Sequence, residues 1–96
     1  MNKIYDSAKI IDCKLGDNLI VGENSFIQNS SLENHVQINR SNMIINSSIG
    51  TYSYTGMNTV IKHTSVGKFC SISWNVSAAG GGDTIIKLYH LIHLLI

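Results

Sequence analysis

The chain is poor in charged residues. Lys, Arg, Asp and Glu make up only 14% of its 96 residues, the formal net charge is +1, and no basic run occurs. Nucleic acid and acidic membrane surfaces are therefore excluded as predicted partners, because both are bound through clustered Lys and Arg. Hydrophobic residues make up 44% of the chain, more than a disordered segment carries. We expect one small folded domain.

Cysteines and long apolar runs are also scarce. Cys13 and Cys70 are far apart and have no metal-like spacing, so we interpret them as buried thiols in a reducing cytoplasm rather than as a disulfide. The first ten residues lack the apolar stretch of a signal peptide. The apolar run at 85–96 is shorter than the ~20 residues that a membrane helix needs. These features predict a soluble, cytoplasmic protein with no membrane partner.

Large aliphatic residues recur with a fixed period. Their positions advance in steps of six, six and five, so the whole pattern has a 17-residue period. The three resulting columns are Leu15, Leu32, Ile49 and Val66; Val21, Ile38, Thr55 and Ile72; and Ile27, Ile44, Ile61 and Ala78. A period of six does not fit a helix, whose apolar period is 3.6. It predicts a prism of short parallel strands, with aliphatic side chains stacked inward at the ~4.8 Å strand spacing.

Two further patterns concern the corners of this prism. Gly or an acidic residue often follows the aliphatic residue, as at Gly22 and Gly56. We interpret these glycines as corner residues whose backbone angles cost other residues ~1 kcal/mol. The segments 29–31 and 46–48 both read Asn-Ser-Ser, and 63–65 reads His-Thr-Ser. These segments are predicted to stack as a polar ladder whose members satisfy one another's hydrogen bonds.

The pattern [LIV]-[GAED]-x-x-[STAV]-x, which residues 4–82 follow, resembles the hexapeptide-repeat acyltransferases. Residues 65–72, which read SVGKFCSI, resemble a segment of the xenobiotic and polysaccharide O-acetyltransferase branch. That branch includes the chloramphenicol and streptogramin acetyltransferases. Residues 73–77, SWNVS, are similar to members from surface-polysaccharide gene clusters.

The resemblance implies a fold and an activity. The fold would be all-β, a single-stranded left-handed parallel β-helix with 17-residue coils. The activity would be transfer of acetyl from acetyl-CoA to a hydroxyl of a sugar or small molecule, with a histidine as general base. The family forms homotrimers with active sites between neighbouring prisms, and it uses neither a metal nor a covalent enzyme intermediate.

The chain departs from the family at its expected catalytic segment. There the branch carries a sequence like G-G-x-N-H-D, whereas here Asp83 directly follows Gly80, Gly81 and Gly82. The expected catalytic histidine is missing, and the repeat period is lost beyond Asp83. We therefore predict a β-helix domain at 1–82 and an apolar non-repeat tail at 83–96. We interpret the chain as an inactive, truncated or frameshifted copy. The alternatives are a genuine variant C-terminus and a non-catalytic β-helix used for assembly or surface binding.

A few side chains remain candidates for a substrate or interface site: Trp74, His63, His35 and Asp83. His35 falls at a corner beside Tyr52 and Phe69 of the next two coils, and solvated corner histidines are the alternative for both His35 and His63. Trp74 could equally be structural, and Asp83 could belong to the tail. His90 and His93 lack an evident third ligand, so no metal site is expected.

Overall fold

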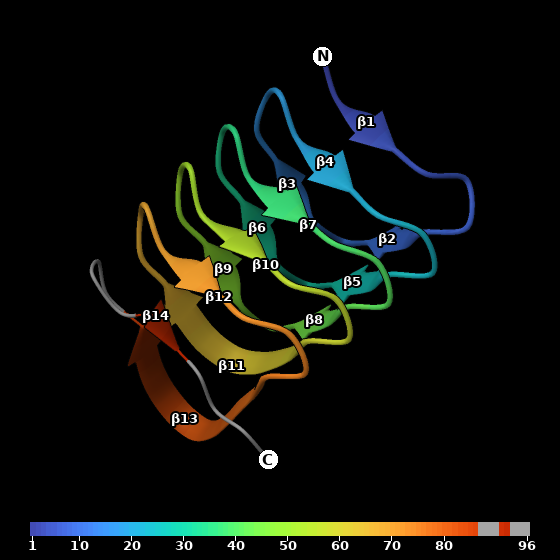
Figure 1. The fold of residues 1–96 in the computed structure, drawn as a ribbon. Coiled ribbons are helices and arrows are strands. Elements are labelled where there is room, and N and C mark those ends of the chain that lie inside the picture. Colours follow the sequence, from blue (N-terminus) through green and yellow to red (C-terminus); the bar gives the residue numbers. More distant parts are fainter. Residues whose placement is uncertain (87–90, 93–96) are drawn as a thin grey trace.

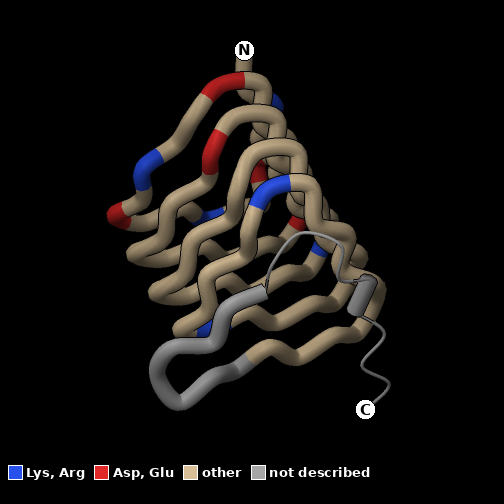
Figure 2. The backbone as a smooth tube through the Cα atoms, turned by 90° about the vertical axis from the view of Figure 1, so that its left-hand side faces the viewer, with Lys and Arg blue, Asp and Glu red and all other residues tan. Residues whose placement is uncertain are grey.

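The computed structural model describes the backbone of residues 1–86 and 91–92 and the side chains of residues 1–78. Within these residues every regular element is a β-strand, and the strands wind into a left-handed parallel β-helix with the cross-section of a triangle (Figure 1). The coils stack along one axis (Figure 2). Strand partners in neighbouring coils follow the 17-residue step, as Val21 and Ile38 do. The predicted fold class and coil length are confirmed.

Each coil contributes a strand to each of three faces. The first face contains β3 (Lys14–Leu15), β6 (Ser31–Leu32), β9 (Ser48–Ile49) and the second half of β11 (Val60–Val66). The second face contains β1 (Lys3–Ile4), β4 (Ile20–Val21), β7 (Gln37–Ile38), β10 (Tyr54–Thr55), β12 (Ser71–Ile72) and β14 (Leu91–Ile92). The third face contains β2 (Lys9–Ile11), β5 (Phe26–Gln28), β8 (Met43–Ile45) and the first half of β11, and β13 (Ser77–Ile86) pairs with β11.

The predicted aliphatic columns form the core. Val21, Ile27, Ile44 and Ile61 are fully buried, because alternate residues of each strand point into the prism. Thr55 is the polar member of its column and is also buried. Its hydroxyl donates a hydrogen bond of 2.6 Å to Oδ1 of the buried Asn42. This polar pair is buried beside the aliphatic columns. The other buried polar side chains are Ser or Thr at the corners and strand ends: Ser25, Ser30, Ser47, Ser53, Thr59 and Thr64.

The corners are built differently from the sequence prediction. Within the described part of the chain, twelve non-glycine residues at successive corners have φ between 49° and 63°: Asp12, Asn18, Asn24, Asn29, His35, Ser41, Asn46, Tyr52, Asn58, His63, Phe69 and Asn75. Six of them are Asn, the side chain that tolerates the left-handed region best after glycine. Gly16, Gly22, Gly50 and Gly56 have no such positive φ. The interpretation of these glycines as left-handed corner residues is wrong.

The glycines are instead required by close approach between coils. A Cβ atom on Gly50 would lie 2.6–2.7 Å from backbone atoms of Gly67 and Lys68 in the next coil. A Cβ on Gly22 would lie 2.7 Å from the backbone nitrogen of Arg40. Glu33, one coil before Gly50, keeps the equivalent backbone hydrogen bond to the next coil. Glycine is therefore required by the local backbone at Gly22 and Gly50, and not by the coil spacing itself.

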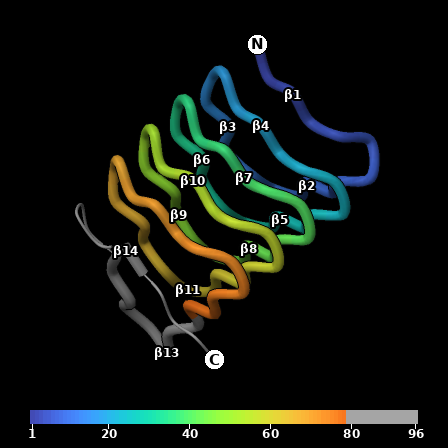
Figure 3. Tube along the Cα trace, in the orientation of Figure 1, coloured from blue at the N-terminus to red at the C-terminus, as the bar shows by residue number. Residues whose placement is uncertain are grey.

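Strand pairing continues past the glycine segment with a changed step. Ile61 pairs with Ala78, which is the usual 17-residue step, whereas Thr64 pairs with Thr84 and Val66 with Ile86, a step longer by three. β14 keeps this longer step and pairs with β12, Ile72 lying opposite Ile92. The coil that contains the glycine segment is thus three residues longer than the regular coils before it. Figure 3 traces these regular coils from the N-terminus onward. The insertion explains why the period is lost in the sequence, while the division of the chain at residue 82 stays a prediction.

Among the described residues, no helix is long and apolar enough to cross a membrane.

Candidate functional site

Three aromatic rings stack at the corner between the first and second faces. The rings of His35 and Tyr52 are 4.6 Å apart between centroids with an interplanar angle of 2°, and those of Tyr52 and Phe69 are 5.4 Å apart with an angle of 7°. The stack forms because the three residues occupy the same corner position in successive coils and share a positive φ. Each such pair stabilises by about 0.5–1.5 kcal/mol beyond its buried area. The predicted neighbourhood of His35 is confirmed.

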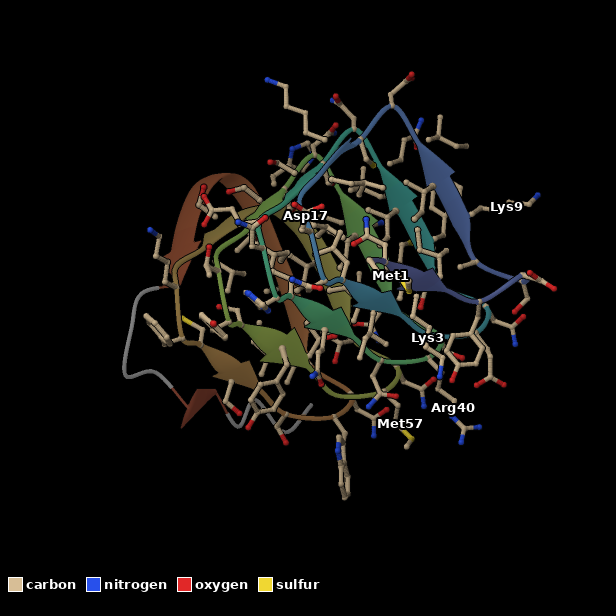
Figure 4. The ribbon with its side chains drawn as sticks, turned by 90° about the horizontal axis from the view of Figure 1, so that it is seen from above. Met1, Lys3, Lys9, Asp17, Arg40 and Met57 are labelled. Carbon is tan, nitrogen blue, oxygen red and sulfur yellow. The ribbon has the colours of Figure 1, made fainter. Side chains whose placement is uncertain are left out.

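Two hollows lie on the second face, beside this aromatic corner. One, of about 280 Å³, is lined by residues of the stack and by Gln37, Ser53 and Tyr54. The other, of about 210 Å³, shares Gln37 and Tyr54 with the first and extends toward Glu23 and Arg40. Arg40 and Met57 occupy the next corner, one above the other in successive coils (Figure 4). The outer surface of this face therefore combines aromatic rings with amide, hydroxyl and charged groups.

The polar ladder lies at the corner between the third and first faces. Nδ2 of Asn29 donates a 2.6 Å hydrogen bond to Oδ1 of Asn46, and Oγ of Ser48 lies 3.3 Å from Oγ of Ser65. The predicted mutual satisfaction of the ladder is confirmed at these two pairs. His63 follows Asn29 and Asn46 in the same column, one coil closer to the C-terminus. It is exposed and has a positive φ of 51°. The ladder and the aromatic corner are separate, so His63 and His35 are not brought together.

Trp74 lies at the same corner as Arg40 and Met57, one coil further along the chain than Met57. Its side chain is 66% exposed, and its Cδ1 atom lies over Gly56, where it would clash with an added Cβ. The indole therefore covers the glycine of the preceding coil. The contact gives the ring a structural role, and its role at a substrate or interface site stays a prediction.

The last sequence candidates lie at or beyond the edge of the described side chains. Asp83 belongs to the backbone of β13, in the longer coil, at the stretch where its pairing with β11 shifts register. The side chain of Asp83, and all of His90 and His93, lie outside the described residues. In the part of the chain that is described, no group of three or more His, Cys, Asp or Glu side chains is arranged to hold a metal ion.

Among the residues whose side chains are described, Glu33 and Cys70 have shifted pKa values. The backbone N–H and the hydroxyl of Thr51 both donate to Oε1 of Glu33, at 2.9 and 3.0 Å, and these bonds lower the pKa of the Glu33 carboxyl. Burial raises the pKa of the Cys70 thiol. Glu33 thus joins two neighbouring coils, and Cys70 stays protonated in the interior, as expected for a structural thiol.

No protein-family profile matches the chain, and no curated protein matches it. Among solved structures, the acetyltransferase domain of PglB from Neisseria gonorrhoeae matches 85% of the chain at 17% identity, with a TM-score of 0.56. The chain shares the fold of this acetyltransferase domain. The same domain in complex with acetyl coenzyme A matches 84% of the chain at 18% identity, with a TM-score of 0.40. A mutant of perosamine N-acetyltransferase from Caulobacter crescentus in complex with CoA and GDP-perosamine matches 82% at 15% identity, with a TM-score of 0.38.

The chain spans about half the length of these solved structures, 52% for the two PglB domain structures and 53% for the perosamine enzyme.

The hollows on the second face were missed by sequence reasoning. Gln37 and Tyr54 follow the same 17-residue step as the core columns, but they occupy the outward position next to each buried residue. Reading the outward columns as well as the inward ones would have placed them side by side.

Proposed function

We propose that this chain is the β-helix of an acetyltransferase that uses acetyl-CoA and a hydroxyl of a saccharide or small molecule, in a shortened copy that does not turn over. The observation that supports the family is the left-handed prism of 17-residue coils, which shares its fold with the PglB acetyltransferase domain over 85% of this chain. The proposed loss of activity rests on the sequence, where Asp83 directly follows Gly82 in place of the Asn-His pair of the family. A cytoplasmic location, expected from the two thiols, is part of this proposal.

The absence of turnover follows from the chemistry of the transfer. The acceptor oxygen attacks the thioester carbonyl carbon, the carbon–sulfur bond breaks, and CoA leaves as the thiol. A general base must take the proton of the acceptor hydroxyl. The family places this histidine after its glycine-rich corner, where this sequence continues from Gly82 directly to Asp83.

Turnover is tested by incubating the chain with acetyl-CoA and a panel of free monosaccharides and chloramphenicol. Free CoA is measured by chromatography, because Cys13 and Cys70 would react with a thiol dye. We expect no CoA release above the protein-free control. Release that depends on both the protein and an acceptor would contradict the proposed inactivity. Calorimetry tests separately whether the chain binds acetyl-CoA, with adenosine diphosphate as the control. We expect heat of binding for acetyl-CoA alone.

The outer surface of the third face supports the expected homotrimer. Its outward residues are mainly apolar, and Met43 and Ile11 are about 40% exposed. Phe26, Ile45 and Val60 are half-buried on the same face. The equivalent outward positions of the first face are Ser31, Ser48 and Ser65. We propose that copies of the chain associate through the third face, because a flat apolar surface is stabilised when it is removed from water.

Association is tested by light scattering on Met43→Glu and on the matched control Ser48→Glu. The monomer mass is 10.5 kDa. We expect wild type and Ser48→Glu to show three times this mass, and Met43→Glu to be a monomer, because its carboxylate would be buried in the apolar contact. A monomeric wild type, or an unchanged mass for Met43→Glu, would refute the assignment of this face.

The same apolar face favours the second candidate function, a non-catalytic β-helix that serves assembly. The two functions differ in their ligands. Self-association without any heat of acetyl-CoA binding would favour the assembly module, whereas binding of acetyl-CoA favours the acetyltransferase.

A further inference from the structure

The exposed Tyr, Phe and Trp side chains of the described residues all lie on one side of the prism. They are Tyr5, Tyr52, Tyr54, Phe69 and Trp74, and they are between 37% and 66% exposed. Tyr54 belongs to β10 of the second face, and Tyr5 directly follows β1 of the same face. The other three lie at the two corners that bound this face. Large rings left together in water mark a surface that binds something.

Tyr54 stands between the two hollows of this face. The hollow of about 280 Å³ lies between Tyr54 and the aromatic corner, and the hollow of about 210 Å³ extends from Tyr54 to Glu23 and Arg40. Gln37 and Tyr54 line both hollows, because they are paired residues of β7 and β10 whose side chains point outward next to one another. The face therefore offers two adjoining spaces with one ring and one amide at their junction.

The polar groups around the hollows are free to bind a ligand. Four exposed side chains make no hydrogen bond or ion pair with any other described residue: the amide of Gln37, the phenol of Tyr54, the carboxylate of Glu23 and the guanidinium of Arg40. Other exposed polar side chains of the prism are used by the fold, since Asn29 and Glu33 are hydrogen-bonded to the neighbouring coil. The second face thus keeps donors and acceptors that the fold does not need.

This combination of groups selects a class of ligand. Glu23 and Arg40 carry opposite charges, so the face has no field of one sign that would favour a phosphate or a polycation. The C–H groups on one side of a sugar ring pack against the negative face of an aromatic ring, as at Tyr54. The hydroxyls of the sugar exchange hydrogen bonds with amide, carboxylate and guanidinium groups. An apolar protein partner would instead fit the third face, whose outward residues are mainly apolar.

We propose that the second face binds a neutral oligosaccharide, with one sugar unit in each hollow and with Tyr54 and Gln37 at the junction between the units. The face lies opposite the corner where the family places its catalytic histidine. The glycine segment lies in β13, which pairs with β11 where the third face meets the first. Binding at the second face needs no general base, so it goes beyond the proposed acetyl transfer and does not depend on it.

The test is a nuclear magnetic resonance titration of the ¹⁵N-labelled chain with four neutral tetrasaccharides: cellotetraose, chitotetraose, maltotetraose and mannotetraose. Each is added up to about 10 mM, ten times a dissociation constant of about 1 mM. We expect at least one of them to shift the amide signals of Gln37 and Tyr54, while those of Met43 on the third face and Ser48 on the first stay in place. No acetyl-CoA is present, so the result is independent of the turnover assay and of the calorimetry with acetyl-CoA.

Three variants locate the binding energy. Tyr54→Thr removes the ring but keeps a residue that favours strands, and we expect the dissociation constant to rise about tenfold. Gln37→Leu keeps the size of the side chain and removes its amide, and we expect a rise of about fivefold. Phe69→Asn is the matched control, because Phe69 is 61% exposed but lines neither hollow, and Asn tolerates its positive φ. Its dissociation constant should stay within about twofold of the wild-type value.

The proposal is overturned if none of the four tetrasaccharides shifts the second-face amides, or if the shifts centre on the third face. Wild-type affinity in a folded Tyr54→Thr chain would also overturn it. The amide spectrum shows whether each variant is folded, and Gln37→Leu decides the question if Tyr54→Thr is not. A smaller mass for Tyr54→Thr than for wild type by light scattering would show that a second copy of the chain occupies this face, and the saccharide assignment would then be wrong.

Discussion

Gly50→Ala is expected to lower the free energy of unfolding by about 3 kcal/mol, at the upper end of what overpacking usually costs. The added Cβ would lie 2.6–2.7 Å from backbone atoms of Gly67 and Lys68 in the next coil. Backbone held by strand pairing on both sides cannot move away as a side chain could. The φ of Gly50 is not in the left-handed region, so the loss would come from the clash and not from the backbone angle. Urea denaturation followed by the fluorescence of Trp74, the single tryptophan, measures it.

Gly16→Ala is the matched control. Gly16 occupies the equivalent position in the first coil, and the atom nearest to its added Cβ is the side-chain oxygen of Asn34. Rotation of that amide would break its 2.8 Å hydrogen bond from the N–H of Asp17. The nearest backbone atoms lie at 2.9 Å, farther than the 2.6–2.7 Å at Gly50, so a smaller loss is expected. If Gly50→Ala were as stable as wild type, close approach between the coils would not be the reason for glycine there.

Asn42→Ala is expected to lower the free energy of unfolding by a similar amount, about 3 kcal/mol, because buried partners lose their hydrogen bonds. Nδ2 of the buried Asn42 donates 3.0 Å hydrogen bonds to the carbonyl oxygens of Arg40 and Gly56. Its Oδ1 accepts the 2.6 Å bond from the hydroxyl of Thr55. The carbonyl of Arg40 would keep its 3.2 Å hydrogen bond from the N–H of Asn58. Alanine would remove the partner of the Gly56 carbonyl and of the Thr55 hydroxyl, at about 1–3 kcal/mol for each buried group that finds no water.

A double-mutant cycle with Thr55→Val isolates the pair. Thr55→Val alone should cost about 1–2 kcal/mol, because Oδ1 of Asn42 loses its donor in a buried site. Once Asn42 has been replaced by alanine, valine at position 55 should cost little or even stabilise, since it would complete an aliphatic column. The expected coupling energy therefore exceeds about 0.5 kcal/mol. Strictly additive losses would mean that the two side chains are not an energetic unit.

The repeat was predictable because it rests on one property, the alternation of inward aliphatic and outward polar residues along short strands. A side chain such as Ile44 contributes the same burial in every coil, so its period is visible in the sequence. The corners were not predictable in the same way. Twelve non-glycine residues there share a positive φ, and side chains as different as Asn58 and Phe69 adopt it. The neighbouring coil imposes that backbone angle, and residue type alone does not reveal it.

Less of the site than of the fold could be predicted from the sequence. The stacking of His35 on Tyr52 follows from the 17-residue step and could be predicted from it. The hollows beside it depend on how outward side chains such as Gln37 and Tyr54 lie against one another, which the period does not specify. The three-residue insertion in the coil after β12 could not be recognised in the sequence, because it lengthens the pairing step between coils at one corner only. Such a change looks in the sequence like the end of the repeat.

The pairing of every described strand only with strands of adjacent coils has a consequence for how the molecule opens. Within the described residues no contact between strands joins the first coil to the last, so cooperative unfolding depends only on the interfaces between neighbouring coils. Opening can begin at either end and proceed one coil at a time, as in other linear repeat arrays. Amide hydrogens of the middle coils, at β7 to β9, then exchange with solvent most slowly, and those of β1 to β3 exchange first. Protection from amide hydrogen exchange therefore rises from each end of the prism toward its middle coils, rather than from its surface to its centre.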